Sequence, residues 1–188
     1  MELKKMQKQP DKLCLVVPCY NEESILENSA SQLLAKLASL RESHLAGAGS
    51  FILFVDDGSK DRTWEIIAKL HADHPAEVSG LKLAANRGHQ NALLSGLLAA
   101  GKEADAIISL DADLQDDIDV LDQFMRESLA GCDIVYGVRS DRSSDSFFKR
   151  FSAESFYRLL SVMGVKTVFN HADFRLMSRR AIEALSAY

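Results

Sequence analysis

The feature that most constrains this chain is an alternation between short apolar runs rich in β-forming residues and longer segments of helical period. Strands are predicted at residues 13–17, 51–56, 80–84, 106–110 and 133–137, and helices at 22–45, 62–74, 89–101, 118–130, 147–163 and 178–187. This order is typical of a mostly parallel sheet covered by helices on both faces. We therefore expect an α/β, Rossmann-like fold.

Length and composition indicate one globular domain. The 188 residues are 47% hydrophobic and 26% charged, which excludes a disordered or low-complexity chain. No Gly-rich or Pro-rich linker interrupts the sequence, so we expect a single domain over residues 1–188, with residues 1–11 as a polar tail. No apolar run is long enough to span a membrane, and the first residues lack the apolar core of a secretory signal.

Charge and cysteine content exclude several classes of protein. The net charge is −5, but residues 136–188 hold nine basic against five acidic side chains. The sequence contains no basic stripe backed by a recognition motif, so nucleic acid is not an expected partner. The three cysteines match no C-x-x-C spacing, so we expect neither a disulfide framework nor a cysteine zinc site, and a reducing cytosol fits best.

Polar segments follow each predicted strand, and these are the expected location of a ligand site. In open α/β sheets, ligands bind beyond the carboxyl ends of the strands, where several such loops converge. The segments are residues 18–23, 56–61, 86–91, 111–117 and 138–142.

Asp111 and Asp113 directly follow a predicted buried strand. In an extended chain, side chains two residues apart point the same way, so these carboxylates can converge on one hard cation, with Gln115 as a neutral oxygen ligand. The pattern D-x-D is common by chance, and solvated acids at a helix start are the alternative interpretation. A second acidic pair, Asp56 and Asp57, ends another strand in the same way. A divalent cation, Mg²⁺ or Mn²⁺, together with a diphosphate would relieve the repulsion between the two pairs.

The glycines in two of these loops predict tight turns. Gly58 permits a positive φ in a turn from which Ser59 or Asp61 caps the next helix. Gly88 permits close backbone approach, and His89 begins a helix whose N-terminus favours anions; a solvated helix-start residue is the alternative for His89. No P-loop, nucleophile elbow or G-x-G-x-x-G fingerprint is present, which argues against kinases, serine hydrolases and dehydrogenases.

Aromatic and basic residues are mixed between residues 147 and 160. An interfacial helix at a membrane surface has this composition, and so does a helix packed on the sheet with its basic side chains extended to solvent. Both interpretations stay open. Four cations could together hold an anionic headgroup such as a lipid phosphate: Arg139, Arg142, Lys149 and Arg150.

Taken jointly and in order, five segments resemble the family 2 glycosyltransferases. The segments are Val16-Val17-Pro18-Cys19-Tyr20-Asn21-Glu22-Glu23, Val55-Asp56-Asp57-Gly58-Ser59, Asn86-Arg87-Gly88-His89-Gln90, Asp111-Ala112-Asp113-Leu114-Gln115 and Asp173-Phe174-Arg175-Leu176. The resemblance is to the polyprenyl-phosphate group, which includes dolichol-phosphate mannose synthase and bacterial undecaprenyl-phosphate glycosyltransferases, and it covers residues 13 to 180. Two positions depart from the common pattern, Cys19 and Arg87.

The resemblance implies a GT-A fold, a nucleoside-diphosphate sugar donor with UDP favoured, and Mg²⁺ or Mn²⁺. It assigns nucleotide-sugar binding to Pro18, Tyr20, Asn21, Glu22, Asp56, Asp57, Gly88, His89 and Ala112. It assigns the metal to Asp111, Asp113 and Gln115. It assigns the acceptor phosphate to Arg139 and Arg150. It implies catalytic roles for Asp111, Asp113, Arg139, Asp173 and Arg175.

The implied reaction is inverting transfer of the sugar to a polyprenyl phosphate at the cytoplasmic face of the membrane. Related bacterial proteins commonly continue into C-terminal membrane helices, so we expect this chain to be a piece that lacks them. Two alternatives remain open: transfer to a polysaccharide or another hydroxyl acceptor, and a nucleotide-sugar-binding module without catalysis. The sequence names neither the sugar nor the oligomeric state, and a homo-oligomer remains compatible with it.

Overall fold

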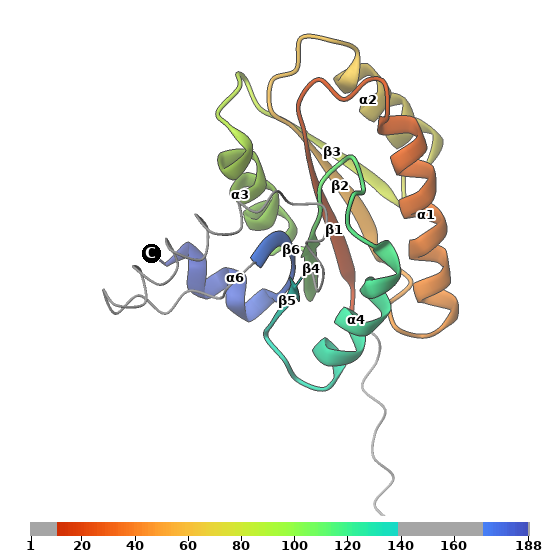
Figure 1. Cartoon of the computed structure of the whole chain (residues 1–188), viewed down its shortest axis with the longest axis vertical. Helices are drawn as coiled ribbons and strands as arrows, with labels where there is room; N and C mark the ends of the chain where they lie inside the picture. The colour runs from red at the N-terminus through yellow and green to blue at the C-terminus, as the bar shows by residue number, and fades with distance from the viewer. Residues whose placement is uncertain (1–10, 139–170, 188) are drawn as a thin grey trace, which may run out of the picture. The chain divides into compact units, whose positions relative to one another are not determined.

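A computed structural model describes residues 11–138 and 171–187 of the chain (Figure 1). The chain divides into two compact units, residues 1–135 with 173–188 and residues 136–172, and the first holds the features discussed below apart from the last residues of β5 and the first residues of β6. The strands are β1 (Leu13–Cys19), β2 (Phe51–Asp56), β3 (Val78–Lys82), β4 (Ala106–Ser109), β5 (Ile134–Val138) and β6 (His171–Ser178). The helices are α1 (Leu26–Glu42), α2 (Thr63–Asp73), α3 (His89–Ala100), the 3₁₀ turn η1 (Ile118–Val120), α4 (Leu121–Leu129) and α6 (Arg179–Ser186).

The strands form one sheet in the order β3-β2-β1-β4-β6-β5. β1 pairs in parallel with β2 and β4, and β2 pairs in parallel with β3, so the predicted mostly parallel α/β sheet is confirmed. β6 runs antiparallel to β4, with Ser109 opposite Arg175. The sequence-based prediction missed β6, although buried Phe174 and Leu176 alternate with polar neighbours at the strand period of two.

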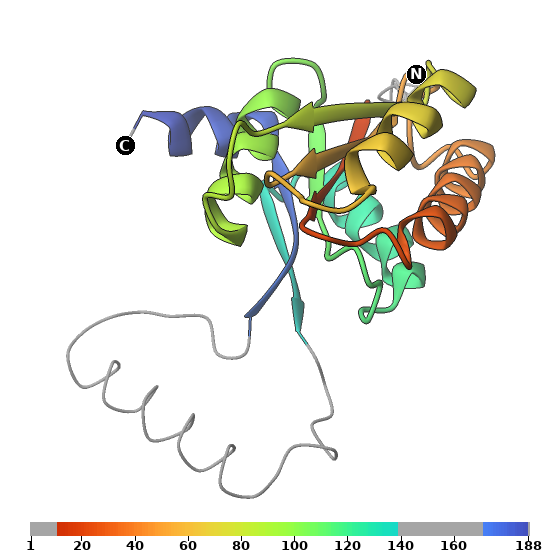
Figure 2. The same ribbon diagram turned by 90° about the horizontal axis from the view of Figure 1, so that it is seen from above.

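Helices cover both faces of the sheet because the inner strands are apolar on both sides. All seven residues of β1 are buried. Cys14 and Val16 belong to a core cluster with Leu97 of α3 and Ile182 of α6. On the other face, the Phe174 ring of β6 packs against Phe124 of α4, with centroids 4.9 Å apart. Figures 1 and 2 show α1, α2 and α4 on one side of the sheet and α3 and α6 on the other.

One helix begins four residues later than predicted, and one strand lies two residues earlier than predicted. α1 begins at Leu26 instead of residue 22, because the positive φ of 58° at Asn21 turns the chain and residues 22–25 form turns. β3 covers Val78–Lys82 instead of residues 80–84, since its pairing with β2 begins at Ile52 opposite Val78. The helix predicted at 147–163 lies outside the described residues. Among the residues that are described, no helix is both long and apolar enough to cross a bilayer.

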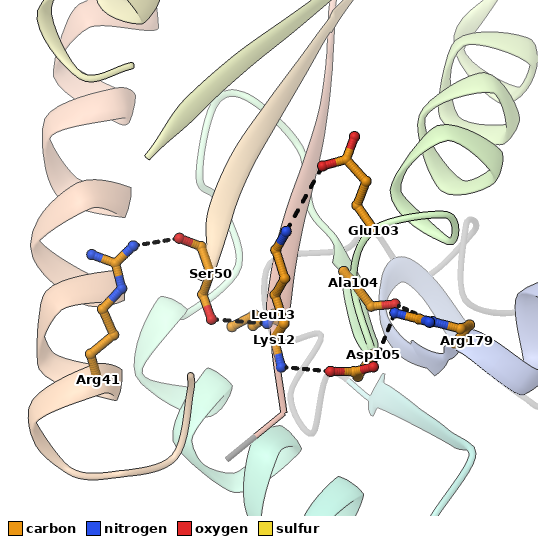
Figure 3. Close-up of polar contacts among 8 residues, drawn as sticks. All are labelled: Lys12, Leu13, Arg41, Ser50, Glu103, Ala104, Asp105 and Arg179. Carbon is orange, nitrogen blue, oxygen red and sulfur yellow. Dashed lines mark hydrogen bonds and ion pairs between the residues drawn. The ribbon is translucent and has the colours of Figure 1, made fainter. Parts of the chain in front are cut away.

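The amino ends of the strands are closed by hydrogen bonds and ion pairs between neighbouring elements (Figure 3). The Leu13 N–H donates to Ser50 Oγ at 2.9 Å, and the Lys12 N–H donates to Asp105 Oδ2 at 3.0 Å. Arg179, at the start of α6, forms an ion pair with Asp105 at 3.0 Å. These contacts join β1 to the starts of β2, β4 and α6.

Replacing Ser50 with alanine should destabilise this edge. The Ser50 hydroxyl is fully buried, accepts from Leu13 N–H and donates to the Gly47 carbonyl at 2.6 Å, so its loss leaves a buried N–H without an acceptor. We expect the free energy of unfolding to fall by about 1–3 kcal/mol, measured by urea denaturation. Ser186→Ala removes an exposed hydroxyl and should change stability by less than about 0.5 kcal/mol. Equal effects of the two substitutions would contradict this account.

Candidate active site

A cavity of about 480 Å³ lies at the carboxyl ends of β1, β2 and β4. Parallel strands end at the same edge of a sheet, so the loops that follow them meet there. The cavity is lined by Pro18, Cys19, Tyr20, Glu22, Asp57, Asn86, Gly88, His89, Ala92, Asp111, Ala112 and Asp113.

The loop after β1 supplies one wall of the cavity. Pro18 and Cys19 are the last two residues of the buried strand, and Tyr20 follows with 39% of its surface exposed, so a planar aromatic face is available to a ligand. Glu22 lies two residues further on. Burial raises the pKa of the Glu22 carboxyl, and the carboxylates of Asp113, Asp61 and Asp111 raise it further. The cavity therefore disfavours additional negative charge unless a cation accompanies it.

The turn after β2 holds the 86–88 segment in place. Asp57 is 3% exposed, and its two carboxylate oxygens accept hydrogen bonds from the backbone N–H groups of Arg87 at 2.7 Å and Gly88 at 2.9 Å. Gly88 has a φ of 87°, which favours glycine, and α3 begins at the next residue as predicted. Asp57 thereby positions the N-terminus of α3 at the cavity.

His89, the first residue of α3, faces the acidic loop after β4. Its Nε2 lies 3.8 Å from Asp111 Oδ1, and both residues line the cavity. The N-terminus of a helix carries partial positive charge, so this side of the cavity is the more favourable one for a bound anion.

The loop after β4 places Asp111 and Asp113 at the same cavity, with Ala112 buried beside them. Leu114 has a φ of 50°, and Gln115 Nε2 donates to Asp113 Oδ2 at 2.7 Å. Within residues 11–138 and 171–187, no three His, Cys, Asp or Glu side chains are grouped to hold a metal ion on their own. The two carboxylates nevertheless fit a divalent cation that takes its other ligands from a diphosphate, since both are oxygen donors and their charges already repel Glu22.

The structure brings together nine of the residues assigned from the resemblance. Those that line the cavity are Pro18, Tyr20, Glu22, Asp57, Gly88, His89, Asp111, Ala112 and Asp113. Those that are described but do not line it are Asn21, Asp56, Gln115 and Arg175. Arg139 and Arg150 lie outside the described residues. The binding and catalytic roles of all these residues stay predictions.

Two of the residues that do not line the cavity lie in the sheet, one at the end of β2 and one in β6. Asp56 is fully buried; its Oδ1 accepts from the Ser59 N–H at 3.0 Å, and within the described part of the chain its Oδ2 has no hydrogen-bond partner. Arg175 lies in β6 opposite Ser109, the last residue of β4. Because β6 is antiparallel to β4, the backbone of Asp173 lies two residues further toward the carboxyl edge of the sheet.

Cys19, Asn86 and Ala92 also line the cavity, although the sequence-based assignment did not include them. Ala92 lies four residues after Gly88 on α3, and this helical spacing is a signal that could have identified it. Cys19 is packed in the core, since it is 2% exposed. Burial raises the pKa of its thiol, and the Glu22 and Asp56 carboxylates add to the effect, so Cys19 is not a thiolate nucleophile at neutral pH.

Comparison with solved structures defines the class of fold. The chain is similar to a mannosyltransferase from Pyrobaculum calidifontis in complex with GDP-Man and Mn²⁺, with a TM-score of 0.60 and 20% identity over 94% of this chain and 47% of that one. The fold, a mixed sheet flanked by helices with a cavity at its carboxyl edge, is that of the GT-A glycosyltransferases.

Sequence comparison then places the chain within a family. The family model for glycosyl transferase family 2 matches residues 14–186, and the chain belongs to that family. It is 52% identical over 182 residues to the uncharacterized glycosyltransferase YkoT of Bacillus subtilis, covering 97% of this chain and 53% of the relative. It is 41% identical over 174 residues to a prophage bactoprenol glucosyl transferase homolog of Escherichia coli, covering 92% and 54%. The chain thus spans about half the length of these curated relatives.

Proposed function

We propose that this chain is the catalytic domain of a metal-dependent hexosyltransferase. It moves a sugar from a nucleoside-diphosphate sugar, with UDP favoured, to a polyprenyl phosphate at the cytoplasmic face of a membrane. The observation that carries the proposal is that Asp111, Asp113, Glu22 and His89 all face one cavity at the carboxyl edge of the sheet. The polyprenyl-phosphate acceptor is supported by the relatives named as bactoprenol glucosyl transferases, at 38–41% identity.

Asp111 and Asp113 would hold Mg²⁺ or Mn²⁺, with the amide oxygen of Gln115 as a further ligand. When bound, the cation supplies neutralising charge for the leaving diphosphate. Tyr20 and Pro18 would contact the nucleoside on the wall that they form. His89 and the start of α3 lie where negative charge on the donor is best accommodated.

The proposed transfer inverts the configuration of the sugar. An oxygen of the acceptor phosphate attacks the anomeric carbon and forms a new carbon–oxygen bond, while the bond from that carbon to the diphosphate oxygen breaks and the nucleoside diphosphate departs with the electron pair. A phosphate monoester has a second pKa of about 6, so at neutral pH the nucleophile is mostly ionised without a strong base. Arginines would then be needed to hold an anion near the acidic edge, and Arg139 and Arg150 are assigned to this, with Asp173 and Arg175 near the sugar and the acceptor.

The proposal is tested by combining donor binding with transfer. UDP- and GDP-sugars are titrated against the chain with and without Mn²⁺, and thermal stability is recorded, because a ligand that binds the folded state raises it with concentration. The donor that binds is then incubated with a polyprenyl phosphate in detergent, and labelled lipid product is measured. Metal-dependent donor binding with transfer to the lipid phosphate is the expected result.

Other outcomes of this experiment point elsewhere. Transfer to a saccharide or alcohol that needs no lipid phosphate would favour the hydroxyl-acceptor alternative. Donor binding without turnover on any acceptor would favour a nucleotide-sugar-binding module. Donor affinity that is unaffected by divalent cations would overturn the metal-dependent reaction.

Replacing Arg139 with alanine should separate the acceptor from the donor. If Arg139 holds the acceptor phosphate, the KM for polyprenyl phosphate should rise about 10- to 100-fold, since a charge-assisted hydrogen bond is lost. The Kd for the nucleotide sugar should change less than about 2-fold, because the donor is assigned to the cavity residues. Steady-state kinetics and donor titration measure the two values. Equal losses of donor and acceptor binding would refute this division.

A further inference from the structure

The loops that follow β1 and β2 are joined by side chain to backbone hydrogen bonds in both directions. The Asn21 N–H donates to Ser59 Oγ at 2.9 Å, and Asn21 Oδ1 accepts from the Lys60 N–H at 2.9 Å. The Glu23 N–H donates to Asp61 Oδ2 at 3.1 Å, and Glu23 Oε2 accepts from the Arg62 N–H at 2.9 Å. We call this arrangement the inter-loop clasp, which comprises Asn21, Glu23, Ser59, Asp61 and Thr63.

Thr63 is at the centre of the clasp. It is fully buried at the first position of α2, and its Oγ1 accepts from the Glu22 N–H at 2.8 Å and donates to Asp61 Oδ1 at 2.6 Å. A hydroxyl has one hydrogen, so donation to Asp61 directs the lone pairs of Thr63 Oγ1 toward Glu22. Burial opposes ionisation of Asp61, but hydrogen bonds from Thr63 and Glu23 outweigh it and hold the pKa of Asp61 below its usual range. Asp61 therefore remains an acceptor at neutral pH.

The clasp residues do not line the cavity, whereas two residues next to them in sequence do. These two residues are Tyr20, which precedes Asn21, and Glu22, which lies between Asn21 and Glu23. The backbone N–H groups of three consecutive residues, 21 to 23, donate to side chains of the loop after β2 and of the first residue of α2. The wall formed by Tyr20 and Glu22 is thus located by the neighbouring loop.

We infer that Thr63 is a positioning residue of the donor site: its hydroxyl, oriented by Asp61, holds Glu22 and with it the wall against which the nucleoside binds. The inference rests on the proposed function in that it takes this cavity to be the nucleotide site. Asn21, which the resemblance assigns to nucleotide-sugar binding, is hydrogen-bonded to the loop after β2 and does not itself line the cavity.

The test compares Thr63→Val with Thr63→Ser. Valine keeps the shape of threonine and removes the hydroxyl, whereas serine keeps the hydroxyl and loses a methyl group. Affinity is measured with UDP, or with GDP if it binds the unsubstituted chain more tightly, in the presence of Mn²⁺ and at a temperature where every variant is folded. Backbone amide exchange of residues 20–23 is measured in the same samples without nucleotide.

Thr63→Val should raise the nucleotide Kd about 10-fold or more and should accelerate amide exchange at Glu22 by a similar factor. In Thr63→Ser, the nucleotide Kd and the rate of amide exchange at Glu22 should both stay within about 3-fold of the values for the unsubstituted chain. A role in stability alone would leave nucleotide affinity unchanged in folded protein. Asp61→Asn keeps one carbonyl acceptor and replaces the other oxygen with an amide nitrogen. It should raise the nucleotide Kd and accelerate amide exchange at Glu22, as Thr63→Val does, and it replaces Thr63→Val in the test if that variant does not fold.

Two results would overturn the inference: unchanged exchange at Glu22 in both Thr63→Val and Asp61→Asn, or faster exchange with unchanged nucleotide affinity. Failure of the unsubstituted chain to bind either nucleotide would instead reject the proposed function. The exchange measurement would still decide in that case whether Thr63 holds Glu22.

Discussion

Replacing Asp113 with asparagine should lower Mn²⁺-dependent nucleotide-sugar affinity and sugar transfer each by about 100-fold or more, a loss typical of removing one strong electrostatic contact from an active site. Asp113 lines the cavity with Asp111 and contributes to the raised pKa of Glu22. Its carboxylate is therefore part of the negative charge that a divalent cation would neutralise, and the nearly isosteric amide removes that charge with little change in shape. Calorimetric titration with and without Mn²⁺ measures the effect.

Asp73→Asn is the matched control for this experiment. It makes the same chemical change at an exposed position near the end of α2, outside the residues that line the cavity. Nucleotide affinity should change less than about 2-fold in this variant, because salt screens the interaction of an exposed charge with a ligand that it does not contact. If Asp113→Asn binds nucleotide as Asp73→Asn does, Asp113 does not hold the metal.

The second large effect is expected from Gly58→Ala. A Cβ at this position would lie 2.6 Å from the Ala85 carbonyl carbon and 2.6 Å from the Asn86 nitrogen, and both atoms belong to backbone that cannot move as a side chain does. The φ of 68° adds strain for any residue with a Cβ. We expect the free energy of unfolding to fall by about 2–5 kcal/mol, the combined scale of a left-handed conformation and an overpacked contact.

Gly131→Ala separates the two causes. Gly131 also has a positive φ, 107°, but a Cβ there would meet nothing within 4 Å, so only the conformational strain of about 1–2 kcal/mol applies. Urea denaturation measures both variants. Gly58→Ala should also weaken nucleotide binding, because displacing residues 85–86 moves Asn86 and Gly88, which line the cavity. Equal destabilisation of the two variants would show that the close approach to residues 85–86 is unimportant.

Local patterns were sufficient to predict most of the sheet. The apolar runs that became β1, β2 and β4 were located to within two residues at each end, because a strand buried on both faces needs a continuous apolar sequence. The edge strand β5 was located to within one residue, although its Ile134 and Tyr136 are exposed. β6 was missed because its polar residues, Asp173 and Arg175, were interpreted as parts of a site loop. In the structure, pairing with β4 is what makes this segment a strand, and such pairing between residues far apart in sequence leaves little local signal.

The order of the five segments was enough to predict the family, and the family match and the fold confirm that prediction. The resemblance also named many of the residues that share the cavity, since residues at the carboxyl ends of neighbouring parallel strands must meet. It did not separate the residues that line the cavity from those that support it. Asn21 and Glu22 are adjacent in sequence, yet one binds the neighbouring loop and the other lines the cavity.

The amino-acid sequence by itself determined the α/β class, the family and the acidic carboxyl edge, because these follow from hydrophobic period, motif order and the chemistry of the residue types. Only the tertiary structure decided that β6 enters the sheet beside β4, that Asp57 holds the start of α3, and that Thr63 holds Glu22. Those contacts join residues from 30 to about 70 positions apart, and they form only when the packed sheet brings their loops within hydrogen-bond distance.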